Sequence, residues 1–109
     1  MAYSEGLAQR IRKALAGQEG LSERKMFGGI AFMLRGNMCC GVLKDELILR
    51  LGPEQVQEAL RKRNTRIFDF SHRPNKGMIM VSASGYKTDA ALREWLRQAT
   101  DFASSLPAR

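Results

Sequence analysis

The stretch that decides the fold is Lys25-Met26-Phe27-Gly28-Gly29-Ile30-Ala31-Phe32-Met33-Leu34. Its apolar run is too short for a typical helix and alternates as a strand does. Two adjacent glycines in such a run need a physical reason, because glycine weakens a strand and marks a bulge, a bend or a close approach of two backbones. We expect Gly28 and Gly29 to let the first strand bend against another element. The alternative, a phosphate-binding loop, is disfavoured because the glycines lead into a strand and not into a helix.

This stretch opens a series of alternating apolar residues that predicts a three-stranded antiparallel meander. The expected strands are residues 29–34, 38–43 and 47–51. The turns between them are too short for the crossover that parallel strands require. One face of the meander is richly apolar, and the other face also carries Met33, Leu43 and Ile48. We expect helices or loops to cover part of this second face, and a dimer or partner surface is the alternative.

Helical patterns flank the meander and two further strands. The expected helices are residues 4–16, 53–64 and 88–106, and the further strands are 66–70 and 78–83. Ser4 is the expected N-cap of the first helix, and Thr88 or Asp89 that of the last. The composition of residues 71–77 indicates a loop. The order α-β-β-β-α-β-β-α predicts an α+β fold with a five-stranded antiparallel sheet and helices packed on one face.

Length and composition fit one globular domain that spans residues 1–109. Apolar residues make up 44% of the chain and charged residues 27%, which is typical of globular domains. No window approaches the ~20 apolar residues of a membrane-spanning helix, and the N-terminus lacks the pattern of a signal peptide. We therefore expect a cytoplasmic protein that does not span a membrane.

Few residues suit catalysis or metal binding. His72 is the only histidine and lies in the predicted polar loop, whereas a general base needs a positioned partner. Cys39 and Cys40 are adjacent, so on a strand they should point to opposite faces, and they lack zinc-finger spacing. We expect free thiols in a reducing compartment, with a reactive cysteine as the alternative. The sequence predicts a protein that is not an enzyme and holds no cofactor and no metal.

Basic residues are the strongest candidates for a binding surface. The net charge is +7, which meets the first criterion for nucleic-acid binding. The candidate residues for contact with nucleic acid or a partner are Arg24, Lys25, Arg35, Arg61, Lys62, Arg63, Arg66, Arg73 and Lys76. No helix-turn-helix, RNA-binding aromatic signature or zinc motif accompanies them, so any DNA contacts would be to phosphates, with little base reading. The alternative is a solvated basic surface that maintains solubility.

Several motifs together resemble the N-terminal domain of the TfoX/Sxy family of competence regulators. They are Met26-Phe27-Gly28-Gly29, the meander after it, the Phe68-x-Phe70 strand, and Leu92-Arg93-Glu94-Trp95 with Ala99 and Ala103. The resemblance implies a five-stranded sheet with three helices, similar to type III secretion chaperones. It also implies a role in competence gene expression together with the cyclic-AMP receptor protein. In that family a C-terminal domain follows, whereas here the sequence ends directly after the last predicted helix, so we expect a stand-alone N-terminal domain.

These observations lead to one leading hypothesis and two alternatives for function. The leading hypothesis is a non-enzymatic macromolecule-binding module, similar to a transcription or competence regulator, that acts through protein partners such as the transcription machinery. The alternatives are sequence-independent nucleic-acid binding through the basic residues, and an uncharacterised small ligand-binding protein. Formation of a homodimer through the second face of the meander is a further prediction. The motif Met26-Phe27-Gly28-Gly29 is expected to be structural.

Overall fold

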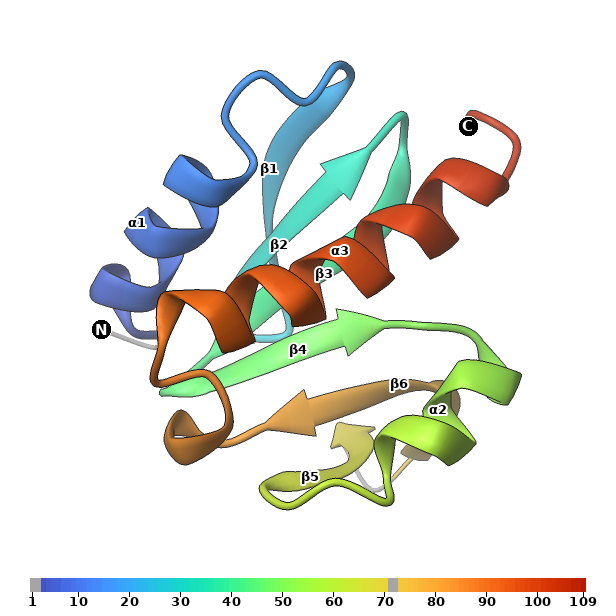
Figure 1. Ribbon diagram of the computed structural model, residues 1–109. Coiled ribbons are helices and arrows are strands. Elements are labelled where there is room, and N and C mark those ends of the chain that lie inside the picture. Colours follow the sequence, from blue (N-terminus) through green and yellow to red (C-terminus); the bar gives the residue numbers. More distant parts are fainter. Residues whose placement is uncertain (1–2, 71–72) are drawn as a thin grey trace.

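The computed structural model describes residues 3–70 and 73–109, with side chains for residues 3–69 and 75–109. One antiparallel sheet has the strand order β1-β2-β3-β4-β6-β5. The strands are β1 (Leu21–Met26), β2 (Gly29–Leu34), β3 (Asn37–Leu43), β4 (Glu46–Arg50), β5 (Thr65–Phe70) and β6 (Arg73–Val81). The helices are α1 (Glu5–Ala14), α2 (Pro53–Ala59), α3 (Asp89–Ser105) and the short 3-10 helix η1 (Ala83–Gly85). The α-helices lie on one face of the sheet (Figure 1), so the predicted α+β class is confirmed.

The predicted count of five strands is wrong, because β1 precedes the glycine-rich stretch and gives the sheet a sixth strand. β1 lies at an edge of the sheet, and its four central residues, 22–25, are exposed. A strand with solvent on both faces carries no apolar alternation, which is the signal that reveals strands in a sequence. The charges along it also suit an edge strand, because they oppose pairing with another chain.

The predicted loop at 71–77 is also wrong in part, because β6 already begins at Arg73. The pairing of β5 with β6 shifts register, since Ile67 pairs with Ile79 and the next residue, Phe68, pairs with Asn75. The turn-forming residues 75–77 therefore lie in an irregular part of a long hairpin. Such irregularities accommodate residue types that a regular strand disfavours.

The second helix is shorter than predicted, because α2 ends at Ala59. After it the backbone makes tighter bonds, from Arg61 N to the Glu58 oxygen and from Lys62 N to the Ala59 oxygen. Asn64 takes a left-handed conformation, with φ of 68°. The basic residues 61–63 consequently lie in a turn between α2 and β5.

The predicted N-caps of the outer helices are confirmed. Ser4 Oγ accepts a hydrogen bond from Leu7 N at 3.1 Å, and Thr88 Oγ1 accepts one from Ala91 N at 3.1 Å. Each cap satisfies a backbone donor that the first helical turn leaves unpaired. The two caps fix where α1 and α3 begin.

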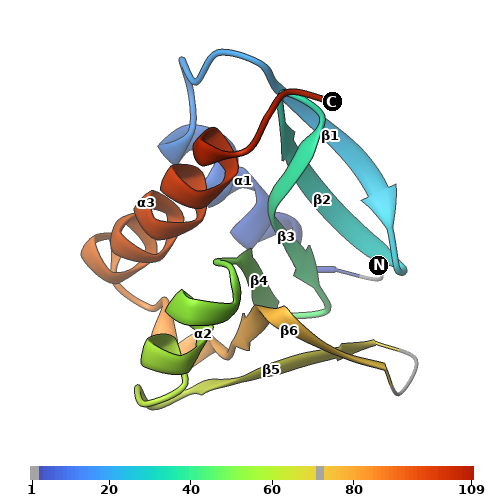
Figure 2. The same cartoon turned by 90° about the vertical axis from the view of Figure 1, so that its right-hand side faces the viewer.

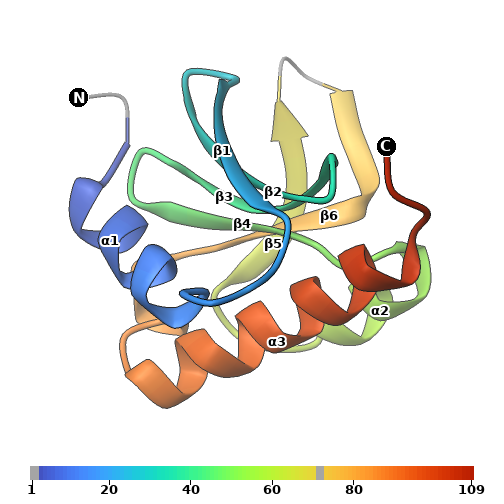
Figure 3. The same cartoon turned by 90° about the horizontal axis from the view of Figure 1, so that it is seen from above.

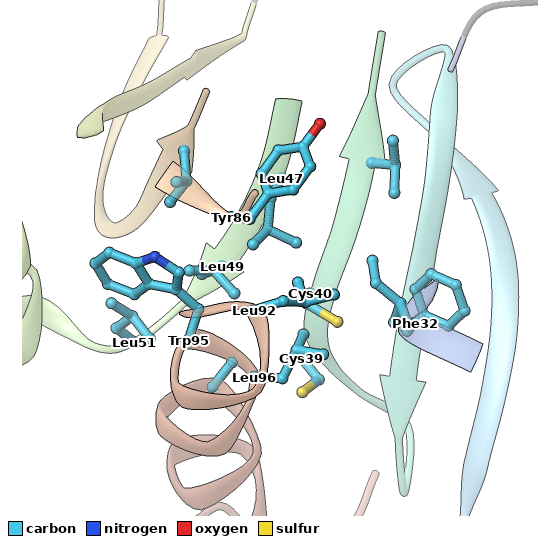
Figure 4. Close-up of a cluster of buried hydrophobic side chains, with 14 of the residues drawn as sticks. Phe32, Cys39, Cys40, Leu47, Leu49, Leu51, Tyr86, Leu92, Trp95 and Leu96 are labelled. Atoms are coloured by element: carbon cyan, nitrogen blue, oxygen red, sulfur yellow. The ribbon is translucent and has the colours of Figure 1, made fainter. Parts of the chain in front are cut away.

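The helix-covered face of the sheet forms the main core (Figure 4). Phe32, Leu47 and Leu49 point from β2 and β4 toward the helices and are fully buried. Trp95 of α3 lies over the same layer, and its Nε1 donates to the Gly85 carbonyl oxygen at 3.1 Å. The buried apolar residues of α3, which include Trp95, therefore pack in the core.

The opposite face of the sheet holds a second buried cluster that is rich in methionine. Its members are Ala31, Met33, Met38, Ile48, Phe68, Met78 and Met80, with Met26, Phe27 and Leu43 packed against them. The sheet curls toward this side, so the β1–β2 and β5–β6 hairpins extend away from the helices (Figure 2 and Figure 3). The Phe27 ring contacts the Phe68 ring edge to face, with centroids 5.7 Å apart. The turn between β1 and β2, which carries Phe27, thus covers part of the second face and reaches β5.

The motif Met26-Phe27-Gly28-Gly29 builds that turn. Met26 pairs with Gly29 at the end of the β1–β2 hairpin, and Phe27 and Gly28 have φ of 43° and 80° between them. Two positive φ values in a two-residue loop match the turn that joins twisted antiparallel strands. A Cβ on Gly29 would collide with the Val42 carbonyl oxygen of β3. The motif therefore combines a tight turn with the close backbone approach that the sequence predicts.

The prediction that Cys39 and Cys40 point to opposite faces is wrong. Phe32 pairs with Cys40 and Met33 pairs with Met38, so Cys39 is an extra residue in β3. Such a bulge breaks the alternation of side chains along the strand. Both cysteines therefore belong to the helix-side core, where they are buried free thiols.

Candidate functional site

The predicted basic residues do not lie on one element or at one edge. Arg24 and Lys25 are on β1, the first strand in the sheet order, and Arg66 is on β5, the last strand. Arg24 and Arg66 stand at the two ends of one row of paired residues that crosses all six strands. Arg35 is in the β2–β3 turn. The structure therefore spreads these cations across the width of the sheet.

Three of the predicted cations near α2 and β5 already have partners. Arg61 lies 3.7 Å from a Glu58 carboxylate oxygen, and Arg66 forms an ion pair with Glu46. Lys62 Nζ lies 5.0 Å from the centroid of the Trp95 ring, a cation–π contact over the edge of the core. Arg63 and Lys76 are exposed. His72 and the Arg73 side chain lie outside the described residues.

A different group of cations lines a groove between α1 and α3, the two helices that Figure 3 shows side by side. The groove consists of two hollows of about 350 and 260 Å³. The first is lined by Arg10, Lys13, Ala14, Asp89, Leu92 and Arg93. The second is lined by Ala14, Leu15, Gln18, Arg93, Leu96, Arg97, Thr100 and Asp101. Because Ala14 and Arg93 line both hollows, we treat them as one feature and call it the α1–α3 groove.

Two of its cations are held by carboxylates of the same chain. Arg10 Nη2 donates to Asp89 Oδ1 at 3.2 Å and to the Tyr86 carbonyl oxygen at 3.0 Å. Arg97 donates to Glu94 at 2.6 Å and to Asp101 at 2.8 Å. Hydrogen bonds from Arg97, with help from Gln98, lower the pKa of Glu94 to about 2. These pairs fix the positions of Arg10 and Arg97 at the two ends of the groove.

Lys13 and Arg93 are exposed and form no ion pair with any residue in the described ranges. Arg93 lines both hollows, and Lys13 lines the first beside Ala14, which also lines both, so we call this part of the groove its centre. In total four cations and two carboxylates line the groove, so it carries an excess of positive charge. Leu92 lines the first hollow and Leu96 the second, and each is only 2% exposed, so the base of the groove offers a small apolar area. A surface of this kind can hold an acidic group above and an apolar side chain below.

The buried thiols lie below the second hollow. Thr100 Oγ1, which lines that hollow, is 3.8 Å from Cys39 Sγ. Hydrogen bonding with Cys40 lowers the pKa of the Cys39 thiol, and the same interaction raises the pKa of Cys40. Cys39 is nevertheless only 1% exposed, so a substrate cannot reach its sulfur in this arrangement.

Within residues 3–70 and 73–109, no group of three or more potential metal-binding side chains comes together. None of the helices in the same ranges has the length and apolar character needed to cross a membrane.

Sequence reasoning missed the cations of the groove for a physical reason. Arg10 and Lys13 are three residues apart on α1, and Arg93 and Arg97 are four apart on α3, as on the solvated face of any amphipathic helix. Only the packing of α1 beside α3 brings the two pairs to one groove. These spacings placed each pair of cations on one face of its helix, but nothing in the sequence indicated that the two helices are neighbours.

Comparison with known proteins identifies the family. A search of curated proteins and a search of solved structures each returned no match, so the likeness to secretion chaperones stays a prediction. The family model described as the TfoX N-terminal domain matches residues 13–103. That match spans β1 to β6, the turn at Phe27 and most of α3. The chain therefore belongs to the TfoX N-terminal domain family.

Proposed function

We propose that this protein is a non-enzymatic regulator-like module that acts by binding a protein of the transcription machinery. The observation that carries the proposal is membership of the TfoX N-terminal domain family, because the resemblance described above implies a role in competence regulation. Fold alone does not assign function, so the geometry must supply a surface for such a partner. The α1–α3 groove is open to solvent, charged and apolar at its base, which suits docking of a protein.

The cyclic-AMP receptor protein and RNA polymerase are the partners to test first, because the family resemblance implies them. The purified chain is immobilised and exposed to each protein at low salt after nuclease treatment, which removes bridging DNA. A basic protein of similar net charge serves as the control for nonspecific attraction. We expect retention of at least one partner by this chain and not by the control. If neither partner is retained above the control, the proposed assignment of partners is wrong.

Sequence-independent nucleic-acid binding is the second candidate function, favoured by the net charge of +7. The spread of the predicted cations argues against one continuous phosphate-binding track through them. A mobility-shift titration with a double-stranded oligonucleotide tests it, because phosphate binding weakens steeply as salt rises. Absence of a shift at low salt rejects this function.

Self-association through the second face of the meander stays a prediction. Met33 and Ile48, which would form that surface, are 7% and 0% exposed in a single chain. Light scattering at increasing protein concentration measures the oligomeric state directly.

A further inference from the structure

The α1–α3 groove offers unpaired charge at its centre and paired charge at its ends. Arg10 and Arg97 are fixed by Asp89 and Asp101, whereas Lys13 and Arg93 have no carboxylate partner in the described part of the chain. An incoming anion therefore gains the most binding free energy at the centre, where it does not have to displace an existing ion pair. The centre is also where the two hollows meet, at Ala14 and Arg93.

The lining distinguishes an acidic protein segment from a nucleic-acid strand. A strand of phosphates running along the groove would pass Asp89 and Asp101, and like charges in close contact are unfavourable. A strand of phosphates would also make no apolar contact with Leu92 and Leu96 at the base of the groove, since phosphates bring no apolar group. A peptide segment can alternate the two kinds of contact, because carboxylates and apolar side chains can project from one face of it.

We propose that the α1–α3 groove docks an acidic, amphipathic segment of a partner protein. Carboxylates of that segment pair with Lys13 and Arg93, and an apolar side chain between them enters the groove above Leu92 and Leu96. This inference rests on the proposed function, since it names the chemistry of the partner that the module binds. It places the docking surface on the helix side of the molecule, in hollows that none of the nine cations suggested by the sequence lines.

The direct test uses a defined probe. A dye-labelled synthetic amphipathic helix, with one face of leucine and one of glutamate, is titrated against the whole chain at low salt, and anisotropy reports binding. The same peptide with lysine in place of glutamate, and a single-stranded oligonucleotide of equal negative charge, are titrated in parallel. We expect the acidic peptide to bind more tightly than either of the others. No binding of the acidic peptide, or tighter binding of the oligonucleotide, overturns the proposal.

Charge-reversal variants locate the site. The double variant Lys13→Glu with Arg93→Glu reverses the centre of the groove, and Lys44→Glu with Arg109→Glu is a matched control with the same change in net charge at exposed positions outside it. We expect the groove variant to weaken peptide binding by about tenfold or more, and the control by less than about twofold. Equal losses in the two variants overturn the proposal, because they would show attraction to net charge alone.

A second measurement keeps the test informative if the groove variant unfolds. Ala14 is exposed and lines both hollows, and Cys39 and Cys40 are buried. The variant Ala14→Cys can therefore be labelled selectively with an environment-sensitive dye. We expect its emission to shift when the acidic peptide is added and to stay constant with the lysine peptide. An unchanged emission at saturating acidic peptide overturns the proposal.

The fate of this inference can be separated from that of the proposed function. If the groove variant retains the transcription partner as strongly as the unmodified chain does, the groove is not the docking site, although the module still binds that partner. If the unmodified chain retains neither partner, the named partners are wrong, and the peptide titrations still decide whether the groove binds acidic segments.

Discussion

One methyl group added at Gly29 is expected to destabilise the fold far more than one added at Gly28. The two glycines are adjacent but meet different surroundings. At Gly28 a Cβ would have no other atom within 4 Å, and only the φ of 80° opposes an alanine. At Gly29 a Cβ would overlap the Val42 carbonyl oxygen and lie 3.1 Å from its carbon and 3.2 Å from Leu43 Cα.

The size of each effect follows from these contacts. A left-handed alanine costs about 1 kcal/mol, so Gly28→Ala should lower the free energy of unfolding by that amount. The atoms that crowd Gly29 are all backbone of β3, and no rotamer change can relieve the overlap. Strands β2 and β3 must move apart where Ile30 pairs with Val42. We expect Gly29→Ala to cost about 3 kcal/mol, at the upper end of overpacking penalties.

Urea unfolding followed by circular dichroism measures both variants. Each 1 kcal/mol corresponds to roughly 4–8 °C in the melting temperature of a domain of this size, so thermal melts give a second reading. Gly36→Ala is the control, because it combines a φ of 84° with a Cβ only 2.6 Å from the oxygen of Arg109, which lies outside the sheet. If the free energy of unfolding of Gly29→Ala lies within about 0.5 kcal/mol of the values for Gly28→Ala and Gly36→Ala, the close approach of β2 and β3 does not require glycine at position 29.

Three further outcomes are expected. A double-mutant cycle of Phe27→Leu and Phe68→Leu should give a coupling of about 1 kcal/mol in urea unfolding, as for other edge-to-face pairs, and additive effects would show that the contact does not close the second face. A hydrogen bond from Arg12 lowers the pKa of Glu23 below its ordinary 4.5, so the pair stabilises the fold above that pH and the contribution is lost as pH falls through the folded pKa. The unmodified chain should therefore lose more stability on acidification than Glu23→Gln does, by less than about 1 kcal/mol because the carboxylate is over a third exposed, and parallel acid curves would contradict this. Both thiols should react with a maleimide only in denaturant, and rapid labelling of the native chain would show that the bulged strand opens.

The elements that could be predicted from the sequence are those with an apolar face. The helix 89–105 and the strands that contain Phe32 and Leu49 carry apolar residues at the spacing of their own secondary structure, so hydrophobic period alone reveals them. β1 has no buried face along most of its length, and its existence depends on pairing with β2, which is a tertiary property. The bulge at Cys39 is likewise a tertiary property that the sequence does not reveal, because it depends on the register between β2 and β3.

The candidate site was less predictable than the fold, because a binding surface is defined by which faces meet. The density of basic residues singled out 61–63, yet Arg61 and Lys62 already contact Glu58 and Trp95. Lys13 and Arg93 are eighty positions apart in the sequence, and only the packing of α1 beside α3 makes them neighbours. Local charge density therefore indicated Arg61 and Lys62, which already have partners, whereas the grouping of Lys13 with Arg93 was found only from the structure.

The motif Met26-Phe27-Gly28-Gly29, which forms the turn between β1 and β2, also shows how local sequence and tertiary packing depend on each other. Phe27 holds a left-handed backbone that phenylalanine rarely adopts, and its ring contact with Phe68 is one interaction that offsets that cost. With Gly29 pressed against β3, the turn extends over the methionine-rich face. Because this face is largely buried, the groove that we propose for docking lies on the helix side of the sheet. The role of the motif is thus structural: it forms the turn that covers part of the methionine-rich face.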